Sequence, residues 1–225
     1  MNKLPCVLVG SVIRGSLRGT HGMLYLVDLE AGTYRTVLCY NDPIDWGGRG
    51  GYRGLRGICF YGEHIYVATS KGLLMLDREF RRLQHYENPY IVDCHEIFFH
   101  DGLIYLTSTK TDSIVTFDVK KECFVQGICL RRGFLGLGKL GRFDPNDSGG
   151  PKFGDTVHLN NVFVEDGRIF VSGAQSRHLL CIEDDEVYFF AILPRWNHNC
   201  RPFRDGVLYN DTTRHRVVFR NSRGE

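Results

Sequence analysis

Three histidines with potential for chemistry stand just ahead of short apolar runs in the second half of the chain. His95 precedes EIFF, His158 precedes LNNVFV, and His198 precedes NCRPF. Neutral imidazoles that converge on one point suit divalent metals such as zinc, iron, manganese or nickel. A metal held in this way can polarise a carbonyl or lower the pKa of a bound water. The histidines are 63 and 40 positions apart, so only the fold can bring them together.

The elements that would position these histidines recur along the chain. Each copy has an apolar run, a two-residue turn, a second run with an aromatic at a fixed place, and a third run that follows a polar link. Asp-Gly supplies the positive φ that a tight β-hairpin requires. The copies span 56–86, 95–125, 160–190 and 199–225, with turns at Gly62-Glu63, Asp101-Gly102, Asp166-Gly167 and Asp205-Gly206.

The aromatic anchors of the copies give the period. They are Tyr66, Tyr105, Phe170 and Tyr209, at intervals of 39, 65 and 39 residues. Four short strands in each period of about 40 residues are typical of a β-propeller, in which a ring of small sheets covers every apolar face. We therefore predict one all-β domain over residues 1–225, a propeller of five four-stranded blades. An open β-solenoid or a sandwich is the alternative.

Two irregularities interrupt the repeat. The long interval contains 26 extra residues, which we place in the glycine-rich segment 131–155 and predict to be an insertion loop, a mobile lid over one mouth of the ring. The first unit is incomplete: 6–13, 23–30 and 33–40 match the second, third and fourth strands of a blade, so its innermost strand is missing. The last unit lacks its outermost strand.

The starts of the first strands are polar although the strands themselves are apolar. In a propeller these strands line the central axis, so the polar residues are expected to face a shared axial cavity. His95 lies six residues before its turn, His158 eight and His198 seven. Because strand side chains alternate between faces, His198 has the opposite parity, which a bulge near Pro202 would correct.

These positions give the predicted site. His95, His158 and His198 are the candidate metal ligands, for one divalent ion of zinc, iron, manganese or calcium. The candidate catalytic residues are Glu96, His95 and His158, with Glu96 moving a proton and Asp93 or Asp155 close by. Arginines at the mouth could hold a carboxylate, sulfate or phosphate. The predicted ligand-binding residues are Arg53, Arg56, Asn160, Asn161, Asn199 and Arg201. Three interpretations stay open: a metal site, a metal-free ligand pocket, and a hydrogen-bonded plug that joins the blades.

Composition excludes several classes of partner. The net charge is +2 and charged residues make up 24% of the chain, so no concentrated basic face for nucleic acid is expected. The stretch 46–57 is similar to an RNA-binding RGG tract, but it is short and single, and we interpret it as a loop between blades over the mouth. No apolar run is long enough for a signal peptide or a membrane span. The eight cysteines include no CxxC pair, and we predict a soluble, cytoplasmic, reduced protein.

At DCHEIFF and HLNN the chain resembles an uncharacterised bacterial β-propeller family that carries D-x-H-[DE] and H-L-N-[GN] at successive blade starts. Asp93, His95 and Glu96 match the first pattern, and 158–161 the second. More loosely the chain is similar to gluconolactonase-type and NHL-type propellers and to virginiamycin-type lyases. The gluconolactonase resemblance implies an axial divalent metal and lactone opening, and the lyase resemblance implies an axial histidine with a metal.

The sequence thus favours a metal-dependent lyase, hydrolase or isomerase that acts on a small polar or carbohydrate-like substrate in the axial pocket. Two other functions are kept. A binding module would hold a ligand with the same residues and no turnover. A scaffold would bind protein partners through an exposed apolar patch on its outer rim.

Overall fold

The computed structural model describes residues 5–13, 20–41, 54–132 and 138–224, and these form five antiparallel sheets. Residues 46–53 of the 46–57 stretch, which include the predicted ligand-binding residue Arg53, lie outside the described residues. Blade 1 contains β1 (Cys6–Gly10), β2 (Gly22–Asp28) and β3 (Thr33–Tyr40). Blade 2 contains β4 (Ile58–Tyr61), β5 (His64–Ala68), β6 (Gly72–Leu76) and β7 (Arg82–Glu87).

Blade 3 is the largest sheet, and blade 5 is as small as blade 1. Blade 3 contains β8 (Ile97–His100), β9 (Leu103–Ser108), β10 (Ser113–Asp118), β11 (Cys123–Arg132) and β12 (Gly138–Phe143). Blade 4 contains β13 (Leu159–Glu165), β14 (Arg168–Gly173), β15 (His178–Glu183) and β16 (Glu186–Ile192). Blade 5 contains β17 (Asn197–Phe203), β18 (Gly206–Asp211) and β19 (Arg216–Asn221). Short 3₁₀ turns, η1 (Thr109–Thr111) and η2 (Thr212–Arg214), replace the polar links of blades 3 and 5.

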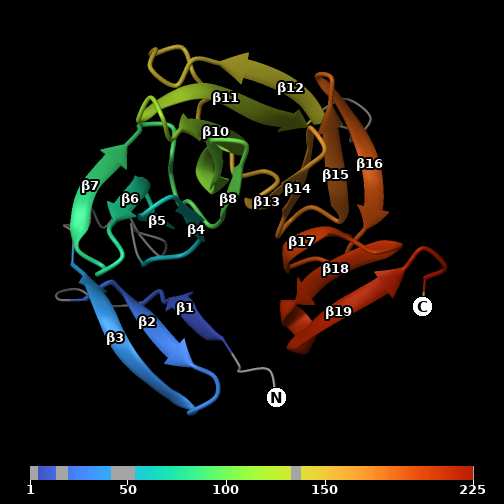
Figure 1. Cartoon of the computed structure of the whole chain (residues 1–225). Helices are drawn as coiled ribbons and strands as arrows, with labels where there is room; N and C mark the ends of the chain where they lie inside the picture. The colour runs from blue at the N-terminus through green and yellow to red at the C-terminus, as the bar shows by residue number, and fades with distance from the viewer. Residues whose placement is uncertain (1–4, 14–19, 42–53, 133–137, 225) are drawn as a thin grey trace.

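The prediction of a five-bladed all-β propeller is confirmed, but the blades do not all have four strands. They have three, four, five, four and three strands within the described residues. Part of the predicted insertion loop is strand β12, which pairs with β11 from Gly127↔Phe143 to Arg132↔Gly138. Figure 1 shows the five sheets arranged in a ring, with β8, β13 and β17 on the inner side.

Apolar clusters between neighbouring blades hold the ring together. One cluster joins blades 1 and 2, a second joins blades 2 and 3, a third joins blades 3 and 4, and a fourth joins blades 4 and 5. The aromatic anchors predicted from the repeat contribute to them: Tyr66 and Phe170 are fully buried, and Tyr209 is buried. No such cluster links blade 5 to blade 1 in the described ranges.

Two of the three predicted Asp-Gly turns form as expected. Asp101 and Gly102 both have positive φ, as do Asp166 and Gly167. The third turn forms one residue earlier, on Arg204 and Asp205, because Phe203 pairs with Gly206. A Cβ on Gly206 would come within 2.1 Å of the Arg220 carbonyl oxygen, so this glycine serves close backbone approach.

The described part of the chain contains no helix that is both long enough and apolar enough to cross a membrane. All eight cysteines are free thiols, five of them buried: Cys59, Cys94, Cys129, Cys181 and Cys200.

Candidate functional site

The three predicted histidines meet at one end of the axis, although each comes from a different blade. The ring centroids of His95 and His158 are 5.5 Å apart, and those of His95 and His198 are 6.4 Å apart. His95 precedes β8, His158 precedes β13, and His198 lies in β17. The structure therefore brings together side chains that are up to 103 residues apart in sequence.

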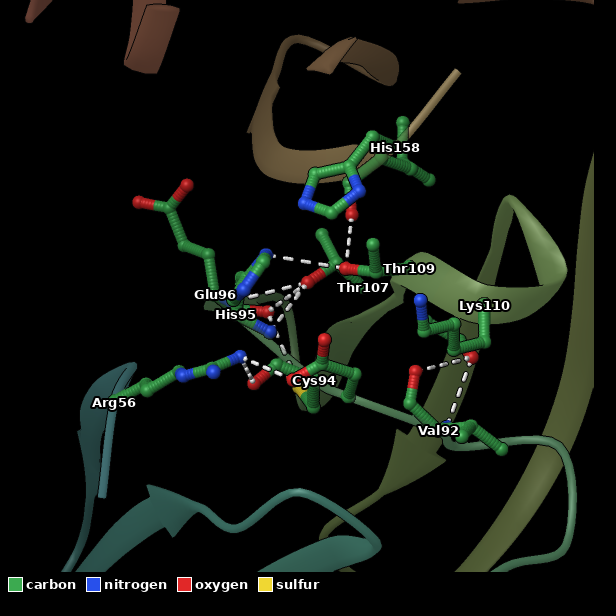
Figure 2. A network of polar contacts seen from close by, with 12 residues as sticks. Arg56, Val92, Cys94, His95, Glu96, Thr107, Thr109, Lys110 and His158 are labelled. Atoms are coloured by element: carbon green, nitrogen blue, oxygen red, sulfur yellow. Dashed lines mark hydrogen bonds and ion pairs between the residues drawn. The ribbon is translucent and has the colours of Figure 1, made fainter. Parts of the chain in front are cut away.

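The tautomer of His95 follows from its hydrogen bonds. The Thr109 hydroxyl donates its single proton to the carbonyl oxygen of Leu159 at 2.7 Å. The same oxygen lies 3.1 Å from Nδ1 of His95, so it must accept the proton of that nitrogen. In the neutral ring the lone pair is then on Nε2. Figure 2 shows the contact between the Thr109 hydroxyl and the imidazole of His95 as a dashed line.

His158 has a carboxylate partner on the same nitrogen. Its Nδ1 lies 2.8 Å from Oδ1 of Asp155, and the second oxygen of Asp155 accepts a hydrogen bond from the Lys110 ammonium. A carboxylate can only accept, so Nδ1 of His158 carries the proton and Nε2 the lone pair in the neutral ring. A histidine oriented by a carboxylate is the usual arrangement of a catalytic base or a metal ligand.

The bulge that would bring His198 into line is present in β17. Two residues, Asn199 and Cys200, stand opposite Tyr209 where the register shifts between His198 and Arg201. The Nδ1 atom of His198 lies 3.3 Å from the carbonyl oxygen of Trp196, which makes that nitrogen the donor. All three rings thus have Nδ1 as their donor.

Unusual backbone conformations surround the histidines. Five non-glycine residues near the cluster have φ between 44° and 62°: Asp93, Asp155, His158, Trp196 and Asn199. Such left-handed conformations are uncommon for residues other than glycine and asparagine, and they concentrate at functional sites. Four of them lie in the segments just before β8, β13 and β17, and Asn199 lies at the bulge within β17.

The spacing of the rings fits two metal ligands better than three. Two imidazoles on one tetrahedral zinc ion place their ring centroids about 5 Å apart, since Zn–N bonds are about 2 Å long. The centroid distance of 5.5 Å between His95 and His158 is close to this value, whereas the 6.4 Å between His95 and His198 is 0.9 Å longer. Over the described ranges, no group of three His, Cys, Asp or Glu side chains is arranged to hold a metal ion.

Glu96 follows His95 in the chain but its carboxyl group points away from the imidazoles (Figure 2). It lines a pocket of about 330 Å³, and its Oε1 accepts a 2.8 Å hydrogen bond from the Asn199 amide. Its Oε2 is buried without a hydrogen-bond partner. Burial raises the pKa of Glu96 to about 7, although the Asn199 amide, the Val162 N–H and Arg201 lower it in part. This carboxyl group therefore exchanges its proton near neutral pH.

The pocket beside Glu96 combines polar groups with apolar walls. Asn199 is held in turn by the amide of Asn210 at 3.0 Å. The other lining residues are Phe98, Asn161, Val162, Phe163, Cys200, Arg201, Leu208 and Val217. A cavity of this composition suits a small molecule with several hydroxyl or carbonyl groups.

Three of the predicted ligand-binding residues join one blade to the next. Asn160 and Asn161 are almost fully buried, and their amides donate to the carbonyl oxygens of Asn197 and Cys200 in blade 5. Arg56 of blade 2 donates to the Asp93 carboxylate and the Cys94 carbonyl of blade 3, at 2.8 and 3.0 Å. The contacts of these three residues are those expected of a hydrogen-bonded plug that joins the blades. Asn199 and Arg201 line the pocket.

Thr109 and Asp112 were not recognised from the sequence. Both lie in the polar link of blade 3, TSTKTDS, which the repeat treats as a connection. Asp112 accepts hydrogen bonds from the N–H groups of Thr156, Val157 and Leu159, at 2.6 to 3.4 Å, and from the Thr156 hydroxyl. It therefore fixes the segment that carries His158.

Comparison with solved structures finds propellers. Virginiamycin B lyase from Staphylococcus aureus has a TM-score of 0.51 at 10% identity, and the match covers 98% of this chain and 73% of that one. The fold is that of a β-propeller. Myxococcus xanthus glutaminyl cyclase has a TM-score of 0.50 at 11% identity, with 96% and 97% covered. Streptogramin B lyase has a TM-score of 0.50 at 10% identity. The match covers 76% of this chain but only 52% of that protein, so the chain spans about half the length of this relative.

No known family profile matches the chain, and no curated protein sequence matches it. At about 10% identity the structural likeness establishes the fold alone.

Proposed function

We propose that the axial end of blades 3 to 5 is the active site of a lyase or hydrolase that moves a proton at Nε2 of His95 or His158. The carrying observation is that Nδ1 is the donor in both rings, whose centroids are 5.5 Å apart. A catalytic base must present its lone pair to the substrate while a second group holds the ring. Thr109 and Asp155 serve as those holding groups.

The substrate in this proposal is a small polar molecule. We place its polar part in the pocket that contains Glu96 and Asn199, which none of the described histidines lines. Both residues directly follow a histidine of the cluster in the chain, so the substrate would have to extend from this pocket to reach an imidazole. The carboxyl, amide and guanidinium groups there bind hydroxyl or carbonyl oxygens, and Phe98 and Phe163 cover an apolar ring face. Two structural neighbours are named as lyases, in agreement with the reaction class proposed.

A divalent metal ion is the alternative role for the same two Nε2 atoms, because a lone pair that binds a metal cannot also accept a proton. His95 and His158 are the ligands whose spacing suits one tetrahedral ion, and His198 becomes a third ligand if its ring shifts toward them. When bound, the ion would polarise a carbonyl oxygen or acidify a water molecule. Elemental analysis of untagged protein checks this alternative, together with the melting temperature in chelator and in added zinc or manganese. A melting temperature that responds to neither, with no stoichiometric metal, refutes it.

Metabolite profiling tests the enzyme itself. Wild-type protein and the double variant His95→Ala/His158→Ala are incubated with fractionated small-molecule extracts, and mass spectrometry follows substrate loss. We expect a compound that only the wild type consumes. His215→Asn is the matched control, because His215 is an exposed histidine outside the site and asparagine tolerates its left-handed backbone. Identical profiles for wild type and double variant contradict the proposal.

Thr109 offers a finer test. Thr109→Val removes the group that accepts the Nδ1 proton of His95, whereas Thr109→Ser retains it. We expect the valine variant to lose the Nδ1–H tautomer in imidazole ¹⁵N NMR spectra, with a fall in turnover of about tenfold, equivalent to about 1.4 kcal/mol. The serine variant is expected to keep both. An unchanged tautomer in Thr109→Val would rule out this holding role.

A further inference from the structure

The outer strand of blade 4 carries an apolar surface that the axial site does not use. β16 has the sequence EVYFFAI, and four of its large side chains are 42 to 66% exposed: Tyr188, Phe189, Phe190 and Ile192. Among the strands that the structure describes, it pairs only with β15, so it is the edge of its sheet. Proteins usually protect such edges with charged residues or proline. β7, the outer strand of blade 2, is protected in this way by its sequence RLQHYE.

A groove runs beside the end of this strand. Phe190, Ala191 and Ile192 form one wall, and the β17–β18 turn with the end of β19 forms the other, around a cavity of about 560 Å³. The Phe190 ring packs edge-on against Phe170, with centroids 5.0 Å apart, and Phe170 belongs to the core between blades 4 and 5. The apolar wall is therefore anchored in the fold.

The second wall is cationic. It contains Arg204, Arg220 and Arg223, with Asp205 as its one acidic residue, which gives a local charge of +2. The Arg220 guanidinium donates to the carbonyl oxygen of Ile192, so a positive charge lies directly at the end of β16. Two copies of the chain would bring two such cationic walls together if they met through this groove. The charge thus opposes self-association here and favours an acidic partner.

We propose that the groove binds an extended segment of another protein, rich in acidic and apolar residues, which adds as a strand to β16. Strand addition satisfies the edge through main-chain hydrogen bonds, and pockets for alternate side chains supply specificity. The apolar side chains lie on Phe190 and Ile192, and the carboxylates pair with Arg204 and Arg223. The proposal is independent of the axial chemistry, because none of these residues lies at the histidines.

A phage-displayed library of random 12-residue peptides, selected on the whole chain, tests the proposal. We expect the selected peptides to contain Asp or Glu among apolar residues. Fluorescence anisotropy should show binding about tenfold weaker or worse for Arg204→Glu/Arg223→Glu and for Ile192→Ser. Hydrogen exchange should show slower exchange of the β16 amides with peptide present. Arg78→Glu, an exposed arginine of blade 2, and His95→Ala are the controls and should leave binding unchanged.

Several outcomes would overturn the proposal. One is the failure of the library to yield acidic and apolar sequences. Another is equal binding of the selected peptides to wild type and to Arg204→Glu/Arg223→Glu. A third is self-association in sedimentation velocity that Ile192→Ser abolishes, because β16 would then pair with a second copy.

Discussion

The junction between blades 3 and 4 and the side of the ring where blades 5 and 1 face each other differ in the contacts between the blades. At the first junction, the Asp112 carboxylate, 3% exposed, accepts three backbone N–H groups, and Thr109 bonds to the Leu159 carbonyl. An apolar cluster that includes Val162 and Leu130 packs beside these bonds. Polar and apolar contacts together fix one blade against the next.

The outer face of blade 5 lacks such contacts within the described residues. Val217 and Phe219 of β19 are 69 and 39% exposed, and Val9 of β1 is 42% exposed. In Figure 1 the first blade (β1–β3) and the last blade (β17–β19) face each other at the lower side of the ring. The comparison teaches that His95 and His158 lie at a junction held by both polar and apolar contacts, as expected when two blades must share one geometry.

The largest effect is expected at Asp112. Asp112→Ala leaves three backbone N–H groups without their partner, one of them buried and two partly buried, so we expect the free energy of unfolding to fall by about 3 kcal/mol. Urea denaturation measures it. Asp166→Asn, in an exposed hairpin, should change it by less than about 0.5 kcal/mol. A similar small loss for both variants would remove the basis of the comparison.

A matched pair of valines tests whether apolar packing differs between the two regions. Val162 is buried in the cluster of blades 3 and 4, and Val217 is exposed on blade 5. Val162→Ala should cost about 2 kcal/mol, because two methylene equivalents leave a packed core. Val217→Ala should stay within about 0.5 kcal/mol. Equal losses in denaturant would show that the outer face of blade 5 is covered in solution.

Glu96 gives the smallest effect, and it depends on pH. Burial raises its pKa to about 7, above the ordinary 4.5 of a glutamate, so the folded chain keeps a proton that the unfolded chain releases. The stability that this proton confers is full below about pH 4.5 and is lost as the pH rises through about 7. The full shift corresponds to about 3 kcal/mol. Because Glu96 is partly exposed, we expect solvent screening to reduce the loss of the wild type relative to Glu96→Gln to about 1 to 2 kcal/mol over that interval.

Urea titrations from pH 4.5 to 8 in chelator measure this difference. The matched control is Glu63→Gln, whose side chain is 76% exposed. A difference between wild type and Glu96→Gln that does not vary with pH would contradict the assigned environment of Glu96.

The sequence predicted the architecture because blade formation is a local property. Hairpin turns such as Asp101-Gly102 and anchors such as Tyr66 and Phe170 recur at fixed spacing, and each strand needs only its neighbours. The parity of His198 even predicted a bulge in β17, which is present. The convergence of the three imidazoles followed from placing each one at the start of an inner strand.

Contacts between blades could not be predicted in the same way. The partners of His95 and His158 depend on how the η1 turn of blade 3 meets the segment before β13, and no periodic pattern encodes that meeting. Asn160 and Asn161 were predicted to bind a ligand because they are polar residues at a blade start. Their bonds to blade 5 were not predicted, and Asn161 also lines the pocket beside Glu96. The fifth strand of blade 3 was missed because KLGRF follows a glycine-rich stretch typical of loops.

The left-handed residues at the axial site have a consequence for engineering. His158 and Trp196 hold backbone angles that glycine adopts without steric penalty. Artificial evolution toward heat resistance alone should therefore drift to glycine at both positions and erase the imidazole as it does so. Selection for the activity proposed above in the same experiment would oppose that drift, and the balance between the two would measure how much that activity depends on an imidazole at position 158.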